Sequence, residues 1–369
     1  MNTVTSAEAH RAIYIDFECL QTTPHPTPEV LGVLGPAAFD TAQAREAGRY
    51  GSGTPEFEQL LVDPRLAPAR VANRRCRVVD AATAVLQLVE RAESEGRLIV
   101  GWSFFDREVA KRANPALAGR IDALYRNAIQ TARPWRQWIH PTFRIQREDQ
   151  YAPKHTLDKY AVLAGYAEAR LLIDAEPAQW IRRALEQLAR RGRYRAITAQ
   201  AKRDWHKLLE YNRHDCLALR HITLKASREL EAWRSYKKAQ FCIDDGATRV
   251  CFHAGSRSRR VDALLERHRT RRWAFITAWN PASVLLDRTE NDRRQQRLRE
   301  DLEGYRILPG EGIGEDSSWD PEESLMVLGI SRGKAVALGS KYGQLAIVVG
   351  TRDSPAELIS CAVTPTSRA

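Results

Sequence analysis

The sequence predicts an α/β protein with two domains. Segments with the period-two alternation of strands are interleaved with segments of helical periodicity along the 369 residues. A chain of this length accommodates two domains of ordinary size more readily than one. The composition changes near residue 240, so we expect a first domain over 1–240 and a smaller α/β domain over 241–369.

The composition is that of a globular protein. Hydrophobic residues make up 43% and charged residues 28%, which excludes disordered, collagen-like and disulfide-scaffold classes. No apolar run approaches the roughly 18 residues of a membrane helix. Residues 1–11 lack the basic start and apolar core of a signal peptide. We therefore expect a cytoplasmic protein with no membrane partner.

The cysteines agree with a reducing compartment. None belongs to a CxxC pair, and several lie in apolar stretches. We expect free cysteines rather than disulfides or a zinc site. They are Cys19, Cys76, Cys216, Cys242, Cys251 and Cys361.

Capping and turn residues delimit the elements of the first domain. Asp80 is suited to cap a helix that Gly96 ends, and Gly192 is expected to break a long helical region. Three prolines predict irregular structure over 134–153. The expected strands cover 12–17, 29–34, 56–62 and 97–101, and the expected helices cover 80–95, 105–112, 157–164 and 177–235.

The second domain shows a shorter strand–helix alternation. Its Gly-rich, acidic segment 309–322 is expected to form a loop, and no strand–helix context makes the GEGIG run a dinucleotide signature. The expected strands cover 273–278, 325–330 and 345–349, and the expected helices cover 257–272, 291–303 and 332–342.

Two carboxylates share one face of the expected first strand, because side chains alternate between its faces. Asp16 and Glu18 lie opposite the face that Ile13 and Ile15 occupy. Carboxylates side by side repel each other and are costly to desolvate, and a divalent cation between them would remove both penalties. The alternative is a solvent-facing edge strand with two ordinary acids.

Two further acids stand out. Asp106 follows an expected strand at a helix start, where an acid also simply favours the helix dipole. Tyr211 and Asp215 are four residues apart, so they share one helix face, and Asp215 interrupts an apolar stripe. A buried carboxylate needs a partner, either a metal ion or an arginine.

The order of these motifs resembles the DEDD family of 3′–5′ exonucleases, which have a ribonuclease H-like fold. DxE on a first strand, FD after a middle strand and YxxxD on a late helix carry the resemblance over residues 10–225. Tyr211 points to the tyrosine subclass, since position 210 is Glu rather than His. IYIDFE and YNRHDCLALR look most like a bacterial branch of predicted nucleases, and the segment 154–158 resembles its Ser-Leu-Lys element. The family's Asn or His before FD is replaced by Trp102-Ser103.

The resemblance implies a mixed sheet flanked by helices and a hydrolase with a two-metal mechanism. Asp16, Glu18, Asp106 and Asp215 would hold two Mg²⁺ or Mn²⁺ ions about 3.5–4 Å apart. Tyr211 would orient the attacking water. The substrate would be DNA or RNA, single-stranded or at a 3′ end, and the product a nucleoside 5′-monophosphate.

Basic residues are concentrated in the first domain. Residues 1–240 hold 38 Lys and Arg against 28 Asp and Glu, whereas 241–369 hold 19 against 18. Such asymmetry favours a polyanionic partner, although it also serves solubility. The segment 133–141 interleaves tryptophans with cations, as stacking platforms and packed cores both do. The expected phosphate contacts, which could equally form a solvated helix face, are Arg182, Arg183, Arg190, Arg191, Arg193, Arg195, Lys202 and Arg203.

The second domain resembles a bacterial domain family without an assigned function. The resemblance covers about residues 270–350 and is carried by TAWNP at 277–281, PGEG at 309–312, Trp319, EES at 322–324 and LG at 338–339. It implies no activity, and substrate recognition or a protein partner are both open. The polar residues expected to line a cleft are Trp279, Asn280, Glu290, Asn291 and Glu323.

Two other functions compete with the exonuclease. The first is a non-catalytic nucleic-acid-binding protein with a degenerate nuclease site. The second places the main activity in the C-terminal domain, with the first domain as a scaffold.

Overall fold

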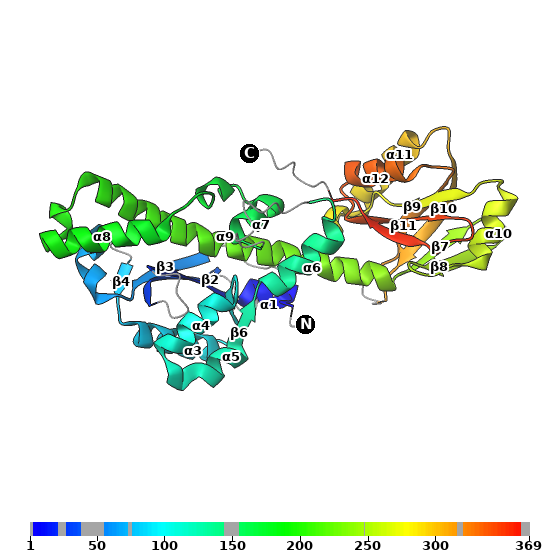
Figure 1. The fold of residues 1–369 in the computed structure, drawn as a ribbon. Helices are drawn as coiled ribbons and strands as arrows, with labels where there is room; N and C mark the ends of the chain where they lie inside the picture. The colour runs from blue at the N-terminus through cyan, green and yellow to red at the C-terminus, as the bar shows by residue number, and fades with distance from the viewer. Residues whose placement is uncertain are drawn as a thin grey trace. The chain divides into compact units, whose positions relative to one another are not determined.

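The computed structural model describes residues 3–20, 27–37, 55–72, 76–143, 155–246, 248–315 and 320–362, and shows an α/β protein with two sheets (Figure 1). Contacts divide it into a first unit, residues 1–133 and 145–227, and a second unit, residues 134–144 and 228–369. The division falls inside helix α9 (Ala199–Lys238), whereas the composition changes near 240. Within the described part, no helix is long and apolar enough to cross a bilayer.

The sheet of the first unit is mixed, with the order β4-β3-β2-β1-β5-β6. Its middle strands β1, β2 and β3 are antiparallel, and the remaining neighbours are parallel. The strands are β1 (Ile13–Cys19), β2 (Pro28–Ala37), β3 (Pro55–Leu61), β4 (Cys76–Val78), β5 (Ile99–Gly101) and β6 (Tyr125–Asn127). The short strands β4 and β6 were not expected from the sequence.

Helices cover both faces of this sheet. Ile13, Ile15 and Phe17 pack into one core with α3, α4 and α5, while Tyr14 packs into a different core with Leu219 of α9. This confirms the alternation expected for the first strand. The helices are α1 (Ser6–Arg11), α3 (Ala81–Ser94), α4 (Phe104–Ala113), α5 (Ala118–Leu124), α7 (Leu157–Ala164) and α8 (Pro177–Arg191), with 3₁₀ turns at Pro64–Ala72, Pro115–Leu117, Ala169–Leu171 and Tyr194–Ala196.

The expected helix boundaries are confirmed where capping chemistry is strong. The Asp80 side chain accepts a hydrogen bond from the Thr83 amide at 2.9 Å. Gly96 and Gly192 follow their helices with φ of +59° and +70°, a conformation that glycine adopts without steric cost. Glycine therefore ends α3 and α8 where the sequence indicated.

The expectation of irregular structure at 134–153 is wrong for its first part. Helix α6 (Ile129–Ile139) continues through Pro134. Trp135 and Ile139 are fully buried, and the Trp135 indole donates to Glu229 at 2.7 Å. Packing of this apolar face outweighs the hydrogen bond that proline removes. Residues 144–154, Lys154 included, lie outside the described residues.

The sheet of the second unit is antiparallel throughout, with the order β13-β12-β9-β11-β10-β7-β8. One face packs against α10, and the other packs against α11 and α12. The elements are β7 (Gln240–Asp244), β8 (Arg249–His253), α10 (Arg259–Arg267), β9 (Arg272–Ile276), a 3₁₀ turn (Pro281–Ser283), α11 (Arg288–Asp301), β10 (Arg306–Ile313), β11 (Glu322–Leu328), α12 (Arg332–Lys341), β12 (Ala346–Thr351) and β13 (Glu357–Ser360).

The loop expected over 309–322 is in its first part the strand β10. A Cβ at Gly310 would lie 2.5 Å from the Cys242 carbonyl oxygen and 2.8 Å from the Phe275 ring. Glycine here permits close approach of neighbouring chain segments rather than flexibility. Residues 316–319, Trp319 included, lie outside the described residues.

The expectation of free cysteines is wrong for one pair. Cys242 and Cys251 form a disulfide between directly opposite positions of β7 and β8, with Cα atoms 4.1 Å apart. The sequence did not predict this hairpin, so nothing indicated that the two residues meet. The free cysteines of the described chain are Cys19, Cys76, Cys216 and Cys361.

Candidate functional site

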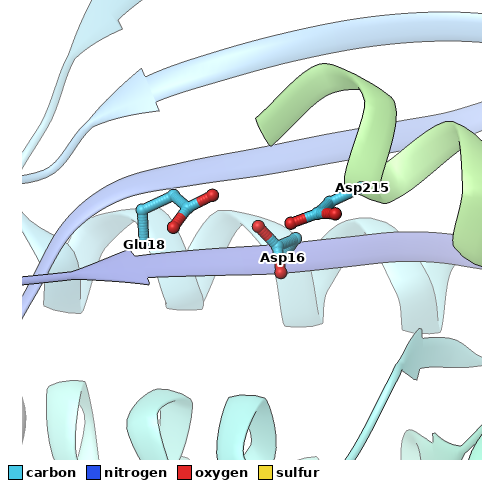
Figure 2. Close-up of side chains that lie close together, drawn as sticks. All are labelled: Asp16, Glu18 and Asp215. Carbon is cyan, nitrogen blue, oxygen red and sulfur yellow. The ribbon is translucent and has the colours of Figure 1, made fainter. Parts of the chain in front are cut away.

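The three carboxylates of Asp16, Glu18 and Asp215 lie together beside strand β1. Asp16 and Glu18 come from β1 and Asp215 from α9 (Figure 2). One carboxylate oxygen of each lies within 4.8 Å of the others. Residues 199 positions apart in the sequence, Asp16 and Asp215, thus belong to one cluster.

A glycine on β2 lets α9 approach the sheet at this point. Gly32 pairs with Asp16 across β1 and β2. A Cβ at Gly32 would lie 2.6 Å from Asn212 Oδ1 and 2.9 Å from Cys216 Sγ, both on α9. The missing side chain therefore brings Asp215 within reach of β1.

Asp106 reaches the same strand from the first turn of α4. It is 4% exposed, and its Oδ1 accepts a hydrogen bond from the Phe17 amide at 3.3 Å. Ser103 caps α4, its side chain accepting from the Phe105 amide at 3.1 Å. The sequence placed Asp106 at a helix start, and the structure adds its contact with the backbone of β1.

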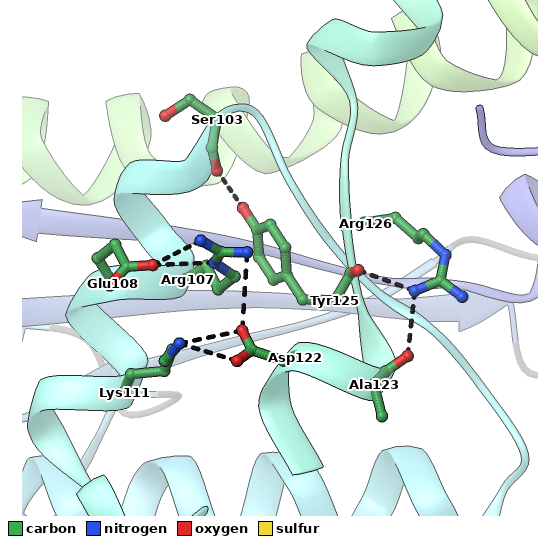
Figure 3. Close-up of polar contacts among 8 residues, drawn as sticks. All are labelled: Ser103, Arg107, Glu108, Lys111, Asp122, Ala123, Tyr125 and Arg126. Carbon is green, nitrogen blue, oxygen red and sulfur yellow. Dashed lines mark hydrogen bonds and ion pairs between the residues drawn. The ribbon is translucent and has the colours of Figure 1, made fainter. Parts of the chain in front are cut away.

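Polar contacts with β6 and α5 hold this end of α4 in place (Figure 3). The Tyr125 hydroxyl donates to the Ser103 carbonyl oxygen. Lys111 contacts both carboxylate oxygens of Asp122, at 2.9 and 3.1 Å, and Arg107 approaches Asp122 at 3.6 Å. The Tyr125 contact fixes the residue that caps α4 before Asp106, and the contacts with Asp122 anchor the rest of the helix.

Burial raises the pKa of all three clustered acids and of Asp106, and repulsion by Asp16 adds to it at Glu18, Asp106 and Asp215. Burial comes first in each case: it raises the pKa of Asp16 to about 6 and, together with Asp16, the pKa of Asp106 to about 8. The pKa values of Glu18 and Asp215 lie well above their ordinary range because of burial and the charge of Asp16. Water is excluded here while like charges are brought together.

The donor set fits a hard divalent cation. Glu18 Oε1 is buried and has no hydrogen-bond partner. Among the described residues, no lysine, arginine or histidine forms an ion pair with Asp16, Glu18, Asp106 or Asp215. Carboxylate oxygens without sulfur or imidazole are the ligands that Mg²⁺ and Mn²⁺ prefer.

Asn212 belongs to this site although the sequence did not single it out. Its side chain is fully buried, and Nδ2 donates to Asp16 at Oδ2 (2.9 Å) and at the carbonyl oxygen (3.2 Å). Oδ1 accepts from Gln59 Nε2 at 3.1 Å. Asn212 lies three residues before Asp215 and therefore on the same helix face. This spacing is the feature of the sequence that could have predicted its place in the site.

Tyr211 also faces the cluster. Its hydroxyl is hydrogen-bonded to Asp215, and its ring meets the edge of Trp180 with centroids 6.0 Å apart. Burial and the neighbouring carboxylates raise the Tyr211 pKa, so the phenol stays protonated at neutral pH. Tyr211 is thus a hydrogen-bond donor rather than a base.

The residues expected to contact phosphates, which lie between 182 and 203, are distributed over α8, the following turn and the start of α9. Arg183 is taken by an ion pair with buried Asp204, Lys202 donates to the Arg195 carbonyl at 2.9 Å, and Arg203 donates to Gln200. The remaining members are exposed and show no carboxylate partner within the described structure: Arg182, Arg190, Arg191, Arg193 and Arg195.

Four of the five residues expected in a cleft of the second unit line one hollow of about 670 Å³, namely Trp279, Asn280, Asn291 and Glu323. Glu290 is not among its lining residues, because its carboxylate turns along α11 to pair with Arg293. The carboxylate of Glu323 pairs with Arg299 at 2.5 Å.

A buried polar network shapes this hollow. Asn280 Oδ1 accepts from the Leu286 amide and from Asn291 Nδ2, both at 3.0 Å, and Nδ2 donates to Glu322 at 2.7 Å. Asn280, Ala282 and Ser283 have φ between +44° and +58°. The network holds a left-handed loop that non-glycine residues seldom adopt.

Comparison with known proteins covers part of the second unit. Residues 276–347 match the model of a family described as a protein of unknown function, DUF3293. No curated protein matches the chain. The matched segment includes the hollow and its network and none of the carboxylate cluster.

Proposed function

We propose that the first unit is a metal-dependent 3′–5′ exonuclease that hydrolyses phosphodiester bonds of DNA or RNA. The observation that carries the proposal is the convergence of Asp16, Glu18 and Asp215 within 4.8 Å, with Glu18 and Asp215 buried and with no ion pair to a cationic side chain among the described residues. The mixed sheet with helices on both faces agrees with the ribonuclease H-like fold that the motifs imply.

Each residue has a role that follows from its position. Asp16, Glu18, Asp106 and Asp215 would hold divalent cations, which supply Lewis-acid stabilisation of phosphoryl charge and lower the pKa of water. Tyr211, whose hydroxyl lies beside Asp215, would orient the attacking water. Asn212 positions Asp16 by one hydrogen bond to its carboxylate and one to its backbone carbonyl oxygen.

The reaction places water oxygen on the terminal phosphorus and breaks its bond to the 3′ oxygen of the preceding nucleotide. The leaving oxygen takes up a proton, so the products are a nucleoside 5′-monophosphate and a shortened strand. The exposed arginines around Gly192 provide charge for the phosphate backbone. The 3′ polarity comes from the resemblance of the motifs.

The test is degradation of 5′-labelled single-stranded DNA and RNA in Mn²⁺. A ladder of shortened products is expected for the unmodified protein and for Glu90→Gln, an exposed acid on α3. Asp16→Asn and Asp215→Asn should abolish the ladder. Metal-dependent binding without cleavage of either polymer would instead support a non-catalytic nucleic-acid-binding protein.

A further inference from the structure

A solvent-open cavity of about 680 Å³ lies in the second unit, between the end of α9 and the α10-bearing face of the antiparallel sheet. Every lining residue falls within 228–358, so the cavity belongs to this unit alone. Its size lies in the range of about 300–1,000 Å³ that is usual for small-molecule sites. It is a different space from the hollow lined by Trp279.

The pattern of side-chain sizes on the sheet creates this cavity. A row of large residues crosses five paired strands: Leu308, Met326, Phe275, Val348 and Leu358. Two residues away from Met326, Phe275 and Val348, the same face carries the smaller side chains of Ser324, Thr277 and Ala346, and Gly312 lies four residues beyond Leu308. Ala232 and Ser235 of α9, and Ala239 just after it, line the same space.

The pocket is open to solvent on its α9 side, where the lining residues Arg228, Arg234, Ser235 and Lys238 are exposed. Its floor is the apolar sheet face, where Phe275 and Val348 are buried. Small residues on the two facing elements leave the space between them, so a small molecule can enter it from solution.

The walls favour a flat, uncharged ring. Phe241 and Phe275 meet edge to face with centroids 5.4 Å apart and line one side. Tyr236 and Ser283 share a hydrogen bond of 2.7 Å and add hydroxyl groups to the lining. Aromatic walls bind rings by offset or edge contacts, and the hydroxyls suit hydrogen-bonding groups at a ring edge.

The charges around the cavity balance. Lys238 pairs with Glu315 at 2.8 Å, and Glu322 accepts from Asn280 at 2.7 Å. Three cations and three acids contribute to the lining: Arg228, Arg234 and Lys238, and Glu231, Glu315 and Glu322. A charged ligand would gain no net attraction from this set.

We propose that this cavity binds an uncharged, flat aromatic molecule of about nucleoside size with polar groups at its edge. The inference rests on the second unit and does not depend on nuclease activity. A nucleoside and an uncharged aromatic amino-acid derivative both have this chemistry.

The first test is a titration of the full chain with N-phenyl-1-naphthylamine, an uncharged aromatic fluorophore. One saturable equivalent is expected. Ala346→Phe and Ala232→Phe, which fill the cavity from opposite sides, should weaken binding at least about tenfold. Ala263→Phe, on the exposed face of α10, should leave it unchanged. Displacement of the fluorophore by adenosine or by N-acetyltryptophanamide distinguishes a nucleoside ligand from an aromatic amino-acid derivative.

Absence of a saturable site, or unchanged affinity in both filled variants, would overturn the proposal. Thermal unfolding supplies an independent readout. Ala346→Phe should leave Tm within about 2 °C, whereas Ala335→Phe in the packed core on the other face should lower it by several degrees. An equal loss of Tm in Ala346→Phe and Ala335→Phe would show that the protein itself fills the cavity. That result would also overturn the proposal.

Discussion

The carboxylate cluster of the first unit and the polar hollow of the second satisfy their buried groups in opposite ways. In the hollow, Asn280 uses its amide in hydrogen bonds at both ends, and Glu323 has Arg299. In the cluster, Glu18 Oε1 has no hydrogen-bond partner, and the charged neighbours of Glu18 that act on its pKa are other acids. Burial of polar groups is common to both, so only the uncompensated charge indicates a missing ligand.

The largest expected difference between the two regions is in catalysis. Asp215→Asn should lower nuclease activity at least about 100-fold, because it removes a ligand and a charge that act on the reacting phosphate. Glu323→Gln, the equivalent change in the hollow, should leave the nuclease rate unchanged. Initial rates on labelled single strands in Mn²⁺ measure both. Equal losses of nuclease rate in the two variants would contradict the assignment of catalysis to the carboxylate cluster.

The next largest effect is on folding, and it lies in the second unit. Asn280→Ala should lower the free energy of unfolding by roughly 2–4 kcal/mol, because it leaves buried partners unsatisfied and puts a Cβ residue without a side-chain hydrogen bond at φ +44°. Denaturant unfolding monitored by tryptophan fluorescence measures it. Asn280→Gly removes the cost of the left-handed backbone conformation. The difference in the free energy of unfolding between the two variants therefore measures that cost.

The pH dependence of stability sharpens the comparison. The raised pKa values of Asp16 (about 6) and Asp106 (about 8) mean that the folded, metal-free protein binds these protons more tightly than the unfolded chain. Their contribution is complete below about pH 4 and is lost as pH rises to 8. A shift of two units corresponds to roughly 3 kcal/mol. Thermal unfolding between pH 4 and 8 should show the decline.

Two controls isolate that decline. Asp106→Asn should make the decline shallower, because the amide does not titrate while the other acids still do. Mn²⁺ should raise Tm increasingly toward pH 8, since ionised carboxylates bind the cation. A Tm that is independent of Mn²⁺ at pH 8 would contradict a metal site in the cluster.

The smallest expected effect concerns the basic surface. Replacing Arg190, Arg191 and Arg193 with serine should weaken single-strand binding and reduce the salt slope by about 2, at about 0.7 per phosphate contact. Arg183→Ser should leave the slope unchanged, because that guanidinium is already paired with Asp204. Fluorescence anisotropy over a range of salt, in the Asp215→Asn background, measures both. Equal slopes would make these arginines an ordinary solvated surface.

Local rules account for much of the fold. The boundaries of α3 and α8 follow from Asp80, Gly96 and Gly192, whose capping roles act within a few residues. The alternation along β1 likewise assigned Asp16 and Glu18 to one face. These features depend on backbone geometry alone, which the sequence specifies directly.

Tertiary packing decided the rest. The course of α6 through Pro134 depends on burial of Trp135, and the Cys242–Cys251 pair depends on a hairpin register that no local signal announced. The identities of Asp16, Glu18 and Asp215 were readable in the sequence. Their distance was not, because it depends on how closely α9 can cross β2 at Gly32.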